Sequence, residues 1–198
     1  MTSRPRLVAI GGSMGGIHAL ESLVSRFPAE MPPVLVVQHI LPAFIGRLAA
    51  RLDAAGALRV VEAADGERLA SGVVYLAPAH RHLLVDESNG QLYVRLSSAP
   101  PVRFHRPSVD ALFHSLAELD AVDVVAVLLS GMGSDGADGL LALRRKGART
   151  IAQDEASSMI FGMPKQAIAL GAARYVASLD ELPAAILASL ASAISRVS

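Results

Sequence analysis

The sequence contains no cysteine, and this absence removes several kinds of chemistry at once. A disulfide scaffold, a thiolate nucleophile and a cysteine-ligated zinc site are all excluded. A net charge is also missing, because 18 lysines and arginines balance 18 aspartates and glutamates. Since nucleic-acid-binding domains usually carry a basic excess, we expect no nucleic-acid partner.

Long apolar runs are absent as well. No apolar stretch approaches the roughly 20 residues that a membrane-spanning helix needs. The basic start Met1–Arg6 is followed only by the short apolar run Leu7–Ile10, which is too brief for the core of a signal peptide. We therefore expect no membrane insertion and a cytoplasmic location.

What the chain does have is apolar content. Hydrophobic residues make up 52% of its 198 residues, enough for a large core in one domain over residues 1–198. Short apolar runs alternate with helical patterns, which predicts an α/β fold with a mostly parallel, doubly wound sheet and helices on both faces. Strands are expected over Leu7–Ile10, Val34–Gln38, Val124–Leu129, Arg149–Gln153 and Arg174–Val176, and helices over Ile17–Phe27, Ala43–Ala54, Gly139–Lys146, Pro164–Leu170 and Asp180–Ile194.

The middle of the chain has a different pattern. Three strand-like runs lie close together at Val73–Leu76, His82–Val85 and Leu92–Leu96, with a turn signal at Asp86–Gly90 between the last two. This pattern predicts an antiparallel excursion over about residues 73–96, at an edge of the sheet.

Polar side chains follow three of the predicted parallel strands, where ligands bind in open parallel sheets. Ser13 lies in the glycine-rich turn Gly11–Gly16, beside the free backbone N–H groups of a helix start. His39 ends the second strand, and Asp135 follows the strand at Val124–Leu129. A hydroxyl, an imidazole and a carboxylate on one edge match the roles of nucleophile, base and orienting group.

Each of these residues also has a purely structural interpretation. Ser13 suits a tight turn or a helix N-cap, and His39 suits an ordinary strand end. Asp135 suits a turn, and Asp138 competes with it for the carboxylate role. His80 and His82 have a spacing that a metal could use, but no third ligand is evident, so we expect neither a metal nor a cofactor. The stretch from His105 to His114 is expected either to shape a cleft or to be a loop followed by a helix that Ser108 caps.

Two known motifs are a poor match to this turn. Gly11–Gly15 fits the G-x-S-x-G pattern of α/β-hydrolases, but that turn would fall on the first strand and the partners would follow in the wrong order. The turn contains no G-x-G-x-x-G, and the chain has no Walker A lysine.

Taken together, the chain resembles the catalytic domain of CheB-type chemoreceptor glutamate methylesterases. The matching stretches are Ile10–Gly16, Val37–His39, Ala64–Glu67, Tyr75–Pro78, His105–Asp110, Leu129–Ala137, Gln153–Ser157 and Phe161–Pro164. The resemblance implies an α/β hydrolytic domain in which Ser13 is the nucleophile, His39 the base and Asp135 the orienting carboxylate. It further implies hydrolysis of glutamate γ-methyl esters on the cytoplasmic helices of chemoreceptors, with release of methanol, and deamidation of receptor glutamines. The oxyanion donors are expected to be the backbone N–H groups of Met14 and Met132.

The chain also departs from the family pattern. Met14 stands where members often have threonine, and Ser134 where they commonly have asparagine. Members that work in chemotaxis usually carry a phospho-accepting receiver domain before the catalytic domain, and we expect only the catalytic domain here, with a separate protein as one possible regulator. Two alternatives stay open: a regulatory or binding module on the same fold, and a small-molecule esterase.

Overall fold

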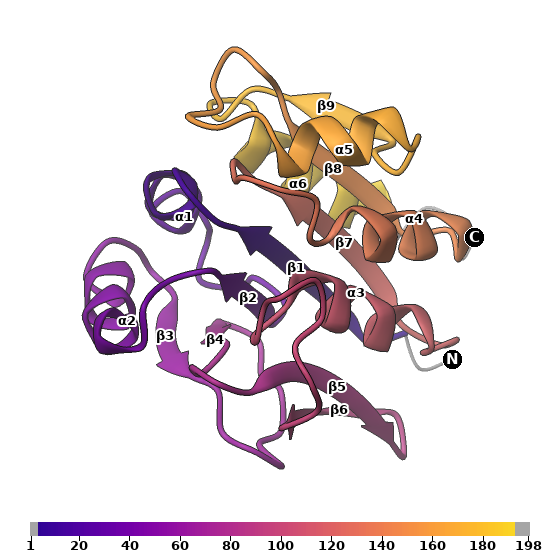
Figure 1. Cartoon of the computed structure of the whole chain (residues 1–198). Coiled ribbons are helices and arrows are strands. Elements are labelled where there is room, and N and C mark those ends of the chain that lie inside the picture. Colours follow the sequence, from indigo (N-terminus) through magenta and orange to yellow (C-terminus); the bar gives the residue numbers. More distant parts are fainter. Residues whose placement is uncertain (1–3, 193–198) are drawn as a thin grey trace.

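The computed structural model describes residues 4–192. Strands and helices alternate over most of this range (Figure 1). The strands are β1 (Arg6–Gly12), β2 (Val34–Gln38), β3 (Arg59–Glu62), β4 (Val73–Leu76), β5 (His82–Ser88), β6 (Gln91–Ser97), β7 (Asp123–Leu128), β8 (Arg149–Gln153) and β9 (Tyr175–Ala177). The helices are α1 (Gly16–Val24), the 3-10 helix η1 (Pro42–Phe44), α2 (Ile45–Asp53), α3 (Val109–Ala117), α4 (Ala137–Arg145), α5 (Met163–Ala169) and α6 (Leu182–Ser192).

A seven-stranded parallel sheet forms the centre of the molecule. Its strand order is β3-β4-β2-β1-β7-β8-β9, so β1 lies between β2 and β7. Neighbouring side chains of β1 point to opposite faces, and Leu7 and Ala9 join one core whereas Val8 and Ile10 join the other. Because both faces of the strand are buried, its sequence is apolar without interruption, as expected for a parallel sheet.

Helices cover both faces of this sheet, which confirms the predicted α/β class. The helices α3, α4 and α5, with the β5–β6 hairpin, pack on one face, and α1, α2 and α6 pack on the other. In Figure 1, α3 lies in front of the sheet close to β1 and the β5–β6 hairpin, and α1 and α2 lie at the left of the view. The loops that join strands to helices of both layers therefore meet at the carboxyl edge of the sheet.

The antiparallel segment is smaller than predicted. Among the strands of the described residues, β5 and β6 alone pair antiparallel, in a separate two-stranded sheet that packs against α3. Val73–Leu76, predicted as part of the excursion, is instead the parallel strand β4 between β3 and β2. Burial explains this, since Val74 contributes to one core and Tyr75 to the other, as an inner strand requires.

Most helix boundaries differ from the predicted ones by a few residues. Gly147 and Gly171 both have positive φ angles just beyond α4 and α5, as predicted for glycines that end helices. The last helix, predicted over Asp180–Ile194, covers Leu182–Ser192 in the structure, and residues 193–194 lie outside the described range. None of the described helices is long and apolar enough to cross a membrane.

Candidate active site

Strand pairing brings Ser13 and His39 to adjacent positions at the carboxyl edge. In the parallel register, Gly12 of β1 is opposite Gln38 of β2, so the next residue of each strand follows side by side. The His39 N–H donates to the Gly12 carbonyl at 3.0 Å, and the Ser13 N–H donates to the Ser130 carbonyl beyond β7 at 3.0 Å. The backbone of Ser13 is thus held between the ends of β2 and β7.

The turn after Ser13 is tight and depends on glycine. Gly15 has φ +82° and is the N-cap residue of α1, without a side-chain cap, so Ser13 does not cap this helix. The Gln38 amide lies beneath the turn and donates to the carbonyls of Ser13 at 2.7 Å and His39 at 3.1 Å. Gly131, in the loop after β7, packs closely against this turn, because a β-carbon at position 131 would lie 2.7 Å from the Ser13 β-carbon. The Ser13 backbone is therefore fixed on several sides.

The histidine and the carboxylate are directly bonded. His39 Nε2 lies 2.9 Å from Asp135 Oδ2, and their side chains are 11% and 1% exposed. Among the described residues, the other ring nitrogen of His39, Nδ1, has no hydrogen-bond partner although it is buried. Asp138, the competing carboxylate, pairs instead with Arg103.

Asp135 sits against the N-terminus of α3. Its carboxylate accepts hydrogen bonds from the Ser108 hydroxyl at 2.7 Å and from the N–H groups of Val109 at 2.8 Å and Asp110 at 3.0 Å. Burial is the largest influence on its pKa and opposes ionisation, but the hydrogen bonds from His39, Asp110, Ser108 and Val109 outweigh it and lower the pKa. Asp135 is therefore an anion held by a helix terminus.

The ring of His105 covers one face of the His39 ring. The rings of His105 and His39 stack with centroids 3.9 Å apart and planes 8° from parallel. Burial lowers the pKa of His105, and His39 lowers it further against an opposite effect of Asp135. His105 is therefore uncharged at neutral pH, and it restricts the orientation of the His39 ring.

Two backbone N–H groups at this edge are available as donors. No described residue accepts a hydrogen bond from the amide of Met14, which follows Ser13, or of Met132, which follows Gly131. Both side chains are exposed, at 54% for Met14 and 66% for Met132. An oxyanion beside Ser13 is the kind of ligand that such paired amides bind.

The remaining candidates lie elsewhere or have structural contacts. His82 is buried. Its Nδ1 accepts a hydrogen bond from the Ser108 N–H at 3.2 Å, and its Nε2 is hydrogen-bonded to the Pro100 carbonyl oxygen at 3.1 Å. Within residues 4–192 no group of three or more histidines and acids is arranged to hold a metal ion. His82 therefore supports the loop that leads into α3.

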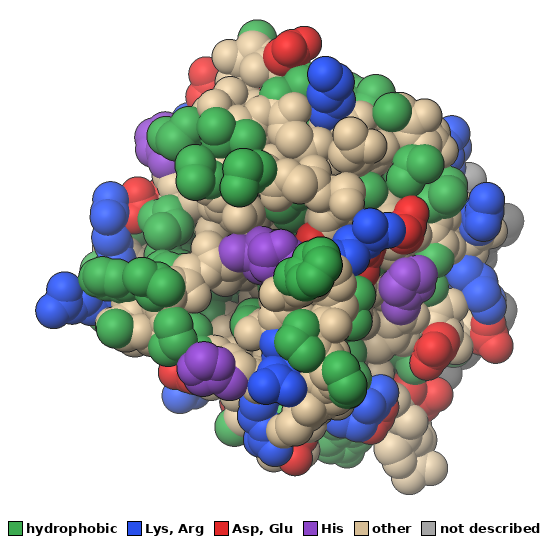
Figure 2. Space-filling view, viewed as in Figure 1, with side chains coloured by type: hydrophobic (Ala, Val, Ile, Leu, Met, Phe, Trp, Pro, Cys, Tyr) green, Lys and Arg blue, Asp and Glu red, His purple; other side chains and the backbone are tan. Residues whose placement is uncertain are grey.

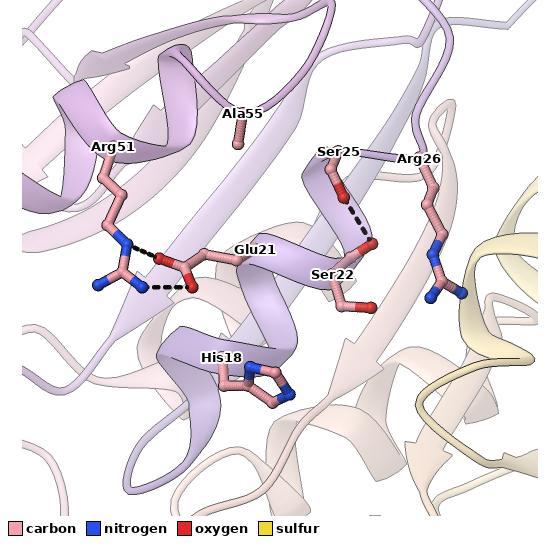
Figure 3. Close-up of a pocket in the computed structure, with 7 residues that line it drawn as sticks. All are labelled: His18, Glu21, Ser22, Ser25, Arg26, Arg51 and Ala55. Carbon is pink, nitrogen blue, oxygen red and sulfur yellow. Dashed lines mark hydrogen bonds and ion pairs between the residues drawn. The ribbon is translucent and has the colours of Figure 1, made fainter.

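A surface pocket of about 430 Å³ lies between α1 and α2, away from these groups (Figure 3). The Glu21–Arg51 ion pair crosses it and His18 lies at one end. Since none of Ser13, His39 and Asp135 lines it, the pocket is not part of the candidate site.

Several contributors to the site were not predicted. Gln38 was expected only as a strand residue, His105 only as a cleft or loop residue, and Ser108 only as a helix cap. Ser108 does cap α3, accepting from the Ala111 N–H at 3.3 Å, while its hydroxyl donates to Asp135. The helix start at Ser108 was a readable signal for an anion site, but the chain path that brings Asp135 there was not.

The fold and this edge together define a class of protein. It is a parallel α/β domain with a hydroxyl, an imidazole and a buried carboxylate at the ends of its strands, the groups that serine hydrolases use. The family model described as CheB methylesterase matches residues 8–186. The chain therefore belongs to the CheB methylesterase family, as the resemblance predicted.

Named relatives agree with this assignment. A protein-glutamate methylesterase/protein-glutamine glutaminase of Anaeromyxobacter dehalogenans is 50% identical over 185 residues, 93% of this chain and 53% of that protein. One from Bordetella pertussis is 48% identical over 189 residues, 95% of this chain and 54% of that protein. The chain thus spans about half the length of these relatives. The crystal structure of the Thermotoga maritima CheB methylesterase catalytic domain is similar with a TM-score of 0.88 and 36% identity, covering 94% of this chain and 98% of that one.

Proposed function

We propose that this chain is a serine hydrolase that removes the methyl group from glutamate γ-methyl esters on the cytoplasmic helices of chemoreceptors. In this proposal Ser13 is the nucleophile, His39 the general base and Asp135 the group that orients the imidazole. The names and similarity of the relatives support the substrate class. The geometry at the edge of the sheet supports the three roles.

The observation that carries the proposal is the His39–Asp135 hydrogen bond, with Nδ1 left without a partner. Because the lowered pKa of Asp135 keeps it ionised, it can only accept, so the proton of the neutral imidazole is on Nε2. The lone pair is then on Nδ1, the nitrogen that would take the proton of Ser13. Relative to the chymotrypsin arrangement, the two ring nitrogens exchange roles.

The proposed reaction has two halves. His39 Nδ1 takes the hydroxyl proton of Ser13 as Oγ attacks the ester carbonyl carbon, and the ring then returns that proton to the departing methoxide, which leaves as methanol. His39 Nδ1 next takes a proton from water as the water oxygen attacks the acyl carbon, and the ring gives that proton to Ser13 Oγ as the acyl–oxygen bond breaks. The glutamate is released and loses its carboxyl proton to solvent, and Ser13 is free again. Asp135 stabilises the imidazolium in both halves.

The backbone amides of Met14 and Met132 are the proposed oxyanion donors. Removing one donor of this kind typically costs about a hundredfold or more in kcat. Since a backbone N–H does not depend on the side chain, methionine in place of threonine after Ser13 leaves the Met14 amide in place. A glutamine side chain can follow the same path, with ammonia leaving in place of methanol.

The test is methanol release from a methylated cytoplasmic receptor fragment. We expect Ser13→Ala to lower kcat on the order of 10⁴-fold or more, as loss of a serine nucleophile does elsewhere. Ser25→Ala is the matched control, because within residues 4–192 the hydroxyl of this exposed serine donates to the Ser22 carbonyl alone, at 3.2 Å. Full activity of Ser13→Ala would reject the nucleophile assignment.

Reagents separate the alternatives. A fluorophosphonate should label the wild-type chain at Ser13, and the absence of labelling in folded protein would favour a binding module. Fast turnover of short acyl esters without methanol release from the receptor fragment would favour a small-molecule esterase.

A further inference from the structure

The turn Val102–His105 presents an unusually exposed aromatic side chain beside the candidate site. Val102 and His105 exchange both backbone hydrogen bonds, at 3.0 and 2.9 Å, and so close a two-residue turn. Its central residues, Arg103 and Phe104, have φ angles of +49° and +67°. Glycine and asparagine are the usual residues at such angles, so a bulky phenylalanine here is strained and calls for an explanation. Phe104 is 100% exposed.

The residues on either side of Phe104 are both held by side-chain contacts. Arg103 donates to Asp110 at 2.9 Å and to Ser134 at 3.2 Å, and it also pairs with Asp138. His105, at the other side of the turn, stacks on His39. The backbone that carries Phe104 is therefore held on both sides, and its exposed ring lies one residue away from the stacked pair. Aromatic side chains have few rotatable bonds, so they lose little entropy on binding and are typical hot spots of interfaces.

Other exposed apolar side chains surround the same edge, and we call this set the apolar rim. In Figure 2, hydrophobic groups lie on either side of a histidine near the centre of the face shown. Met14 follows Ser13, and Met159 is its neighbour across Gly15, where an added β-carbon would lie 2.6 Å from that of Met159. The apolar rim consists of Met14, Leu41, Phe44, Phe104, Met132 and Met159.

The rim draws on both layers of the fold. Phe104 belongs to the loop before α3 on one face of the sheet, whereas Met14 and Phe44 precede α1 and α2 on the other. A partner that reaches Ser13 must therefore contact apolar side chains on both sides of the nucleophile. Methionine side chains adapt their shape to a partner, which suits a surface that accepts related segments.

The charges around the rim indicate an acidic partner. Arg47 lies over the Phe44 ring at 6.0 Å, and Lys165 is exposed at the start of α5, next to the loop that carries Met132. Glu155 is an exposed acid on the same edge. The two cations can pair with carboxylates that flank an esterified glutamate.

We propose that Phe104 is the docking residue for an amphipathic, acidic helix of the protein substrate, with the rest of the apolar rim receiving its apolar face. This inference rests on the proposed function and adds to it the residue that binds the helix of the protein substrate. Addition of an extended strand is disfavoured, because Val102 and His105 use their backbone N–H and C=O groups to pair with each other and the chain turns between them. A helix presents apolar side chains on one face, on both sides of the esterified glutamate.

The test compares two substrates with one variant. Phe104→Asn removes the ring and places at positive φ a residue that tolerates it. We expect kcat/KM for a methylated cytoplasmic receptor fragment to fall at least about tenfold more than kcat/KM for p-nitrophenyl acetate, as loss of a hot-spot side chain would cause. Phe104→Tyr should restore most of the difference. Leu170→Asn, an exposed apolar residue at the end of α5, is the control and should change neither value.

The outcomes distinguish the two proposals. Phe104→Gly is a second variant, free of strain. If kcat/KM falls equally for both substrates in Phe104→Asn and in Phe104→Gly, the docking role of Phe104 is wrong while the methylesterase assignment stands. If the wild-type chain hydrolyses the acetate but not the fragment, the proposed function fails and the docking proposal fails with it.

Discussion

At the scale of single residues, the position of His39 depends on contacts with three other residues. His39 is bonded by Asp135 on its edge and covered by His105 on its face, while its backbone N–H bonds Gly12. A ring bonded only at one nitrogen can still tilt about that bond. The stacked His105 removes this freedom, and reactions of positioned groups are sensitive to small displacements.

We therefore predict that His105→Ala lowers kcat for a short ester about tenfold, because the uncovered ring of His39, the proposed base, would then be free to move from its position. His105→Phe keeps a flat ring against His39 and should recover most of the activity. Steady-state kinetics at pH 7 to 8 measures both variants. Equal losses in the alanine and phenylalanine variants would mean that the stacking itself does not position the base.

At the scale of elements, the N-terminus of α3 stabilises the negative charge of Asp135. Asp135 lies in the loop between β7 and α4 and accepts hydrogen bonds from the Ser108 hydroxyl and two backbone N–H groups at the start of α3. Helix termini of this kind bind anions because their N–H groups lack partners within the helix. The same contacts join the loop after β7 to α3, so they contribute to stability as well as to chemistry.

This arrangement predicts a pH-dependent effect of Asp135→Asn. Since the folded-state pKa of Asp135 lies below its ordinary value of 3.8, its ionised form stabilises the fold. That contribution is fully present above pH 3.8 and is lost as the pH falls through the lowered folded-state pKa. We expect the variant to lower the free energy of unfolding by about 3 kcal/mol at pH 7, and the gap from wild type to shrink at pH 3.

Urea unfolding followed by circular dichroism at pH 7, 5 and 3 measures this gap. Asp120→Asn is the control, because its side chain is 87% exposed beside Lys146 and a surface pair of this kind adds little stability. A gap for Asp135→Asn that stays the same from pH 7 to pH 3 would show that the charge is not what stabilises the contact.

The elements also show which parts of the structure the sequence could predict. Val34–Gln38 and Arg149–Gln153 were predicted with the bounds of β2 and β8, because buried parallel strands are apolar on both faces. Arg59–Glu62 was not predicted as β3, because an edge strand that exposes Arg59 and Glu62 lacks that pattern. Val73–Leu76 was predicted as part of an antiparallel excursion at the edge of the sheet but pairs parallel to β2 and β3, since strand pairing depends on chain path rather than on local pattern.

The site follows the same distinction. The positions of Ser13, His39 and Asp135 after buried strands were readable, because all parallel strands end at one edge. The contacts of His105 and Gln38 were not, because they depend on how a loop folds back and on how a side chain lies beneath a turn. Phe104 carried no readable signal, since neither full exposure nor a positive φ angle is usual for its residue type.

At the scale of the whole molecule, the candidate site exists only when both layers are packed on the sheet. His39 and Asp135 are 96 residues apart in the chain, and the second is held by α3 on one face. The turn that carries Ser13 leads into α1 on the other face. The reactivity of the serine should therefore report the integrity of the entire fold.

The prediction is that fluorophosphonate labelling of Ser13 and the helical signal are lost in one transition as urea is added. An isolated serine hydroxyl is a weak nucleophile, so residual segments that keep Ser13 but separate it from His39 should not react. Labelling rates and circular dichroism at matched urea concentrations measure the two curves, which should share a midpoint if unfolding is two-state. Labelling that persists after the helical signal has gone would mean that the nucleophile is activated locally, within its own turn. Labelling that disappears well before that signal would instead mean that the edge of the sheet opens while both layers stay packed.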